Sequence, residues 1–124
     1  MKKILFAAIL SLSFNVFSQT IPLPIEKLIK VYQYKSYSLD DGRLSVVIKK
    51  TEVTYDMIQL FFEGVCSSQY DKAWAPDVIK SVTLINIEEN QSYTVKGGGN
   101  ECIKMGKMNG DETSQYLKSL IVEN

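Results

Sequence analysis

The fold of this chain depends on how one segment is interpreted, VTYDMIQLFFEGVCS (residues 53–67). Thr54 has the side chain of a helix N-cap, and Asp56 suits the first turn of a helix. The competing interpretation is a strand within a hairpin, because Val, Tyr, Ile and Phe all favour strands. We predict a helix, because the apolar residues recur at the spacing of one helical face: Met57, Ile58, Phe61, Phe62 and Val65.

The residues before this segment predict one helix and one strand. A helix is expected near residues 24–34, because Ile25, Leu28, Ile29 and Tyr32 follow one helical face. We leave the end of this helix open, since residues 31–37 are rich in side chains that favour strands. The DDG motif at residues 40–42 predicts a turn, and the alternation over residues 43–50 predicts a strand.

The residues after this segment predict an irregular loop and a hairpin. The loop is expected over residues 67–77, and the strongest strand over residues 79–87. Because this strand carries apolar residues on both sides, we expect it to be central or covered on both faces. A polar turn at residues 88–91 and a second strand at 92–96 complete a hairpin.

The last part of the chain predicts one more helix, near residues 111–122. Asn109 and Glu112 have the residue types of its N-cap and N3 positions. Residues 101–108 are short and mixed, with a single turn of helix as the expected structure. The order of elements predicts an α+β fold in one small domain, residues 19–124. We expect a short antiparallel sheet of about three strands, with two or three helices packed on one face and one disulfide.

The first 18 residues have the pattern of a signal peptide. Lys2 and Lys3 precede an uncharged, largely apolar run over residues 4–17, and Ser18 provides a small residue for cleavage. An uncleaved anchor is the alternative, but the run is shorter than the roughly 20 residues that span a bilayer. We therefore predict a leader that is cleaved after residue 18. The mature protein is then periplasmic or secreted, without stable insertion in a membrane.

Two cysteines follow the leader, Cys66 and Cys102. In an exported protein, a single pair of cysteines predicts one intrachain disulfide. The alternative is a reactive thiol, which requires a neighbouring base or positive charge to lower its pKa. Because the chain contains no histidine, we predict that the two residues are bonded.

The composition argues against several classes of function. Without histidine, the chain lacks a Ser-His-Asp triad, a Cys-His pair and an HExxH zinc motif. The chain has 14 basic and 14 acidic residues, and removal of Lys2 and Lys3 with the leader leaves 12 basic residues, for a net charge of −2. The sequence also shows no basic stripe of the kind that binds nucleic acid. We predict no enzymatic activity, no cofactor, no metal and no nucleic-acid partner.

Two features remain as candidate sites. The run Gly97-Gly98-Gly99 offers backbone N–H groups that could surround an anion, but it matches no phosphate-binding motif, and a turn is the simpler interpretation. Tyr70 and Trp74 lie in the expected loop and are residue types that anchor protein partners. The alternative for Trp74 is that it packs onto the core.

These features predict a small exported protein without catalytic groups. Its expected role is to bind or inhibit a protein partner, such as a cell-wall hydrolase. The alternative is a structural or assembly accessory of the cell envelope, and a small hydrolase is a third class. The sequence identifies neither the partner nor the oligomeric state.

Overall fold

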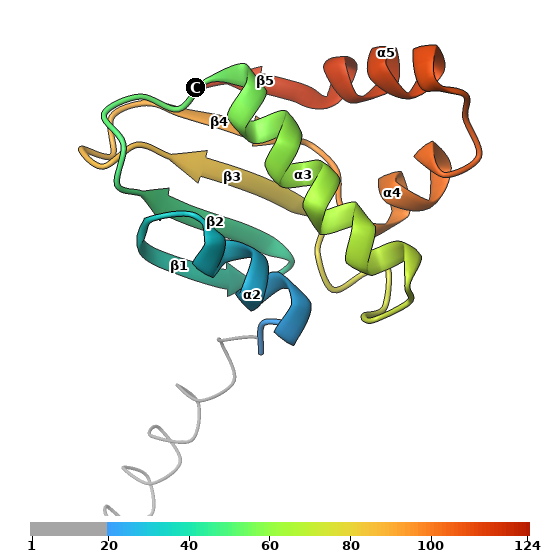
Figure 1. Cartoon of the computed structure of the whole chain (residues 1–124), viewed down its shortest axis with the longest axis horizontal. Coiled ribbons are helices and arrows are strands. Elements are labelled where there is room, and N and C mark those ends of the chain that lie inside the picture. The colour runs from blue at the N-terminus through green and yellow to red at the C-terminus, as the bar shows by residue number, and fades with distance from the viewer. Residues whose placement is uncertain (1–19) are drawn as a thin grey trace, which may run out of the picture.

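The computed structural model describes residues 20–124, so the predicted leader, residues 1–18, lies outside the described residues. Within residues 20–124, four helices and five strands form an α+β fold (Figure 1). The helices are α2 (Leu23–Val31), α3 (Tyr55–Tyr70), α4 (Gly99–Met105) and α5 (Gly110–Leu120). The strands are β1 (Tyr34–Asp40), β2 (Arg43–Ile48), β3 (Ser81–Ile85), β4 (Ser92–Val95) and β5 (Ile121–Glu123).

The sheet is larger than expected and is mixed rather than antiparallel. Its order is β1-β2-β3-β4-β5, with β3 at the centre as predicted. Only the β2–β3 pair is parallel. The expectation of about three antiparallel strands was wrong, because α3 crosses the sheet between β2 and β3 and returns the chain in the same direction. The number of helices also exceeds the two or three expected.

The two strands missed from the sequence lie at the edges of the sheet. The first expected helix ends at Val31, and the chain enters β1 at Tyr34. At the predicted DDG turn, Asp41 and Gly42 have φ values of 52° and 79°. Two positive φ values in a two-residue loop fit the type I′ turn of a tight hairpin. At the other edge, the last expected helix stops at Leu120 and the next three residues pair with β4 as β5.

The prediction of a helix in the central segment is confirmed by α3. Thr54 is its N-cap, and the Thr54 side-chain oxygen accepts a hydrogen bond from the Met57 backbone N–H at 3.3 Å. The helix continues to Tyr70, so the first part of the expected loop 67–77 is helical. The predicted apolar face is buried, at Ile58, Phe61, Phe62 and Val65.

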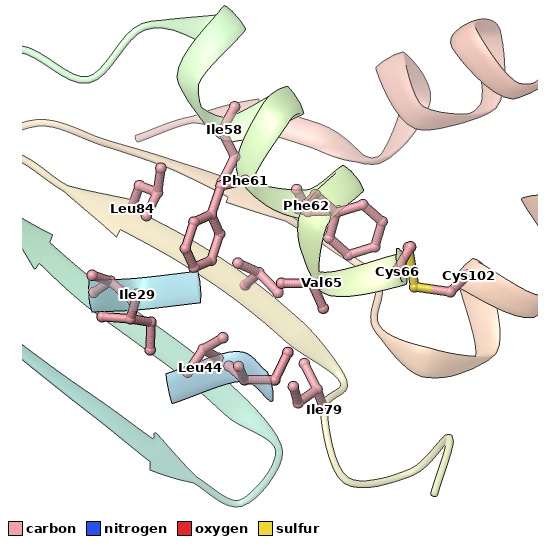
Figure 2. Close-up of a cluster of buried hydrophobic side chains, with 14 of the residues drawn as sticks. Ile29, Leu44, Ile58, Phe61, Phe62, Val65, Cys66, Ile79, Leu84 and Cys102 are labelled. Atoms are coloured by element: carbon pink, nitrogen blue, oxygen red, sulfur yellow. A yellow bond between two sulfur atoms is a disulfide. The ribbon is translucent and has the colours of Figure 1, made fainter. Parts of the chain in front are cut away.

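The core lies between α2, α3 and one face of the sheet (Figure 1). Figure 2 shows Ile29 of α2 and Phe61 of α3 lying over Leu44 and Leu84 of the sheet. Where α2 crosses α3, Leu28 packs over Gly64. A Cβ atom at Gly64 would come within 2.8 Å of the Leu28 side chain, so glycine permits this close packing.

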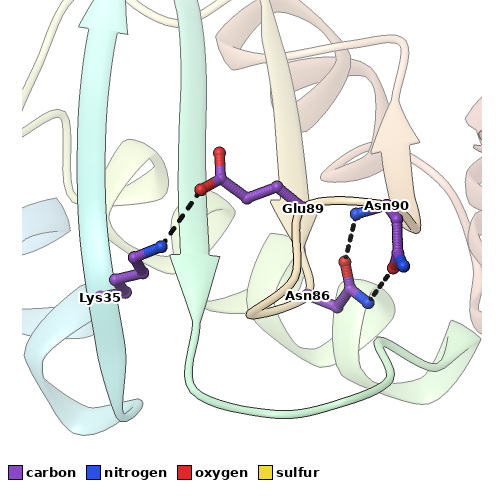
Figure 3. Close-up of polar contacts among 4 residues, drawn as sticks. All are labelled: Lys35, Asn86, Glu89 and Asn90. Carbon is purple, nitrogen blue, oxygen red and sulfur yellow. Dashed lines mark hydrogen bonds and ion pairs between the residues drawn. The ribbon is translucent and has the colours of Figure 1, made fainter.

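The opposite face of the sheet is rich in hydroxyl groups. Strand register aligns Ser38, Ser45, Thr83 and Thr94 in one row across four strands. The Thr83 and Thr94 hydroxyls share a hydrogen bond of 2.8 Å. At one end of this face, Lys35 and Glu89 form an ion pair of 3.3 Å, which reaches across β2 (Figure 3). Such polarity fits a sheet face that meets water.

The tip of the β3–β4 hairpin is held by two amide side chains. Asn86 donates to the Thr51 carbonyl and to the Asn90 side chain, and accepts from the backbone N–H groups of Asn90 and Gln91 (Figure 3). The Gln91 amide exchanges two hydrogen bonds of 2.7 Å with the backbone of Val53. These bonds attach the hairpin to the segment that precedes α3.

The predicted disulfide is confirmed between Cys66 and Cys102, with an Sγ–Sγ distance of 2.06 Å. Both residues are buried. The bond joins the last turns of α3 to α4 (Figure 2). It therefore connects two helices through cysteines that are 36 residues apart in the sequence.

Candidate functional site

An open hollow of about 590 Å³ lies where the C-terminal end of α3 meets the following loop and α4. Side chains from three segments form its walls: Gln69 and Tyr70 of α3, Trp74 and Pro76 of the loop, and Ile103 of α4. We call it the α3–α4 hollow. A concave surface with apolar and aromatic walls and a few polar groups is the usual form of a binding site.

The exposed large apolar side chains of the hollow are Tyr70 and Ile103. Tyr70 is 49% exposed and Ile103 37% exposed, which is high for large apolar side chains. Burial raises the pKa of the Tyr70 phenol above its usual value of 10.0, so the phenol stays protonated to a higher pH than a free tyrosine does. These two residues offer a partner apolar surface together with one hydroxyl group.

Trp74 lies in the wall of the hollow but is mostly buried. Only 7% of the residue is exposed, and its indole N–H donates to the Ser68 hydroxyl at 2.9 Å. Of the two interpretations offered by the sequence, the structure favours packing on the core, because α3 extends far enough to place Ser68 under the indole. A direct contact between Trp74 and a partner stays a prediction.

The loop leaves α3 through a tight C-terminal motif. The Lys72 N–H donates to the Gln69 carbonyl at 2.8 Å, and the Ala73 N–H donates to the Ser68 carbonyl at 3.2 Å. Lys72 has a φ of 58°, in the left-handed region that glycine usually occupies at this position. A lysine in this conformation lies at the rim of the hollow.

The glycine run attaches α4 closely to the loop. A Cβ atom at Gly98 would lie 1.9 Å from the Ile79 carbonyl oxygen, and one at Gly99 would lie 2.3 Å from that of Pro76. The Gly99 N–H donates to the Ile79 carbonyl, and the Gly98 N–H to the Glu101 side chain. Because both N–H groups are already bonded, these contacts favour the turn over an anion site.

The amide of Gln69 is the main polar group in the wall. Gln69 is only 5% exposed, and its side-chain N–H donates a long bond of 3.5 Å to the Trp74 carbonyl. Within residues 20–124, its side-chain oxygen accepts no hydrogen bond. No fully enclosed side-chain oxygen or nitrogen of this part of the chain lacks a partner. The Gln69 oxygen is therefore reachable from the hollow.

Two lysines provide the charge of the hollow. Lys72 and Lys107 line it, and none of its lining residues carries a carboxylate. Neither lysine belongs to any of the ion pairs formed between described residues. The rim is thus locally positive, although acidic residues outnumber basic ones over residues 20–124.

Sequence reasoning found Tyr70 and Trp74 but missed Gln69, Lys72, Ile103 and Lys107. Three of these lie within three residues of a predicted site residue or of Cys102, yet no periodic pattern marks them. Their convergence depends on how α4 docks on α3. That docking depends on the disulfide and on the close packing at the glycine run.

The described residues show two further absences. Residues 20–124 contain no group of three or more acidic, cysteine or histidine side chains placed to hold a metal ion. In the same range, no helix combines the length and the apolar character needed to cross a membrane.

Comparison of the chain with protein-family models, curated proteins and solved structures finds no match. A functional assignment therefore depends on the geometry of the α3–α4 hollow.

Proposed function

We propose that this chain is an exported, non-catalytic protein that binds a partner protein through the α3–α4 hollow. The observation that carries the proposal is an open concavity whose exposed large apolar side chains are Tyr70 and Ile103. Tyrosine is enriched among the residues that dominate binding energy at interfaces. The lining includes Tyr70, Lys72 and Lys107, but no carboxylate, imidazole or thiol that could act with them as an acid, base or nucleophile.

The walls of the hollow are held in place before any partner binds. The disulfide at Cys102 joins α4 to α3, and the Gly99 N–H joins α4 to the loop through Ile79. The indole of Trp74 attaches the loop to α3 through Ser68. A rigid surface loses less conformational entropy on binding, which favours affinity.

Inhibition of an enzyme is the role that we place first. A small exported protein without catalytic groups can act by covering the active site of another protein, and a cell-wall hydrolase is the partner class that we propose. Assembly within the cell envelope is the alternative. The export on which both roles depend is supported by the predicted leader and is compatible with the disulfide.

Site-specific cross-linking tests the proposal. We would replace Tyr70 with a photoreactive phenylalanine analogue and, as a matched control, Leu60, which is exposed on the same helix about 15 Å away along its axis. Illumination in an envelope extract should give one cross-linked partner from position 70 and none from position 60. Loss of the partner's hydrolase activity on binding would assign inhibition, and recovery of a multiprotein assembly would assign the accessory role. Equal cross-linking at both positions, or none at position 70, would contradict binding through the hollow.

A further inference from the structure

We infer that the α3–α4 hollow binds a short extended segment of its partner in which an apolar side chain lies next to a carboxylate. This inference rests on the proposed function, since it names the chemistry of the occupant of the same site. Three features of the hollow support it, and each corresponds to one part of the bound segment.

The apolar part of the hollow would receive the apolar side chain. Tyr70 of α3 and Ile103 of α4 both line the hollow, and Pro76 contributes the loop wall. The volume of about 590 Å³ lies within the range of small-ligand pockets. It is large enough for one bulky side chain and a short length of backbone, but not for a folded element.

The amide of Gln69 would bind the backbone of the segment. Its oxygen accepts no hydrogen bond from residues 20–124, and its N–H donates only the 3.5 Å bond to the Trp74 carbonyl. A buried amide normally has its hydrogen bonds satisfied by protein or water. An extended peptide presents N–H and C=O groups side by side, so it can satisfy both sides of this amide.

The two lysines would bind the carboxylate. Lys72 and Lys107 line the hollow without an ion-pair partner among the described residues, and the neighbouring carboxylates Asp71 and Asp77 are not part of its lining. A positive rim attracts acidic segments and disfavours basic ones.

The backbone conformation of Lys72 affects the choice of a variant that tests its charge. Its φ of 58° is a conformation that glycine adopts without strain and lysine does not. Sparsely populated conformations of this kind gather at functional sites. Lys72→Gly therefore removes the charge without adding backbone strain, so a loss of binding would not come from a destabilised backbone.

A peptide-display selection on the full protein tests the inference. Random eight-residue peptides would be selected, and the affinity of each recovered peptide would be measured by fluorescence polarisation. We expect the peptides to carry Asp or Glu within two positions of a large apolar residue. The double variant Lys72→Gly, Lys107→Gln should weaken their binding by about tenfold, and added salt should weaken binding to the unmodified protein. Leu60→Ser should change nothing, and the melting temperature of the double variant should not fall.

The alternative results separate the two proposals. Recovered peptides that are neutral or basic, or that bind the double lysine variant equally well, overturn the inference. If such peptides still lose binding to Tyr70→Ala, the hollow remains a binding site and only the assigned chemistry is wrong. Peptides insensitive to Tyr70→Ala contradict the hollow itself. A selection that recovers no peptide overturns the inference, whereas cross-linking at position 70 decides the binding function independently.

Discussion

The two ends of α3 differ in how completely the polar groups around them are paired. At the N-terminal end, the side chains of Asn86 and Gln91 make hydrogen bonds to the backbone of residues 51–53 and of the hairpin. At the C-terminal end, the Gln69 oxygen accepts no bond from residues 20–124, and Lys72 and Lys107 form no ion pair there.

This difference indicates where polar side chains maintain the fold and where they are available to a partner. Buried amides that are fully bonded stabilise one arrangement of the chain, because leaving any of them unpaired is costly. An amide and two ammonium groups around an apolar hollow keep their bonding capacity for another molecule. Substitutions of these polar side chains should therefore change stability at the N-terminal end of α3 and binding at the C-terminal end, where Trp74 and the disulfide hold the walls in place.

The largest expected effect is at the wall of the hollow. Trp74→Ala should lower the free energy of unfolding by about 3–5 kcal/mol, because it removes a buried indole and leaves a cavity. Urea denaturation measures this change. The control is Tyr70→Ala, whose exposed ring should cost less than about 1 kcal/mol. Equal losses for the two variants would mean that the indole does not hold the wall.

Loss of the disulfide should have the next largest effect. The double variant Cys66→Ala, Cys102→Ala opens a loop of 36 residues and should cost about 2–5 kcal/mol of stability. The bond holds α4 to α3, so backbone amide exchange should increase most in α4 and around the hollow. If amide exchange also increased equally in the β3–β4 hairpin, the disulfide would stabilise both ends of α3 alike.

A pair of matched substitutions compares the two buried amides directly. Asn86→Leu removes a side chain that makes four hydrogen bonds and should cost about 2–3 kcal/mol. Gln69→Leu removes one long bond and should change stability by less than about 1 kcal/mol. Thermal denaturation of both variants measures the difference. The comparison of the two ends fails if Gln69→Leu is the more damaging change.

The smallest expected effect is a gain in stability at the rim. Lys72→Gly should raise the free energy of unfolding by about 0.5–1 kcal/mol, because glycine adopts the positive φ without a steric penalty. Lys118→Gly, at an exposed position inside α5, should lower it by about 1 kcal/mol. Chemical denaturation of the two variants checks the opposite signs. A loss at Lys72 would show that its side chain stabilises the fold.

Local signals in the sequence were sufficient to predict the helices whose N-caps lie within a few residues of their first turn. Thr54 caps α3 as its position predicts. Asn109 and Glu112 form the predicted capping box of α5, with bonds of 2.9 and 3.1 Å. The disulfide was predictable because only one pair of cysteines exists. In each case the deciding interaction involves residues close in sequence, or a pairing without alternatives.

The sequence by itself therefore determined the α+β class, the central helix and strand, and the disulfide. Tertiary structure decided the edge strands, the parallel pairing and the hollow. In β1 only Leu39 is buried, and β5 has three residues, so neither shows a clear alternation. Their pairing depends on neighbouring strands that offer free backbone groups. The α3–α4 hollow likewise exists only because α4 and the loop dock on α3, which brings together Gln69, Ile103 and Lys107. Packing determines the contacts between residues that are distant in sequence, so no local sequence pattern predicts them.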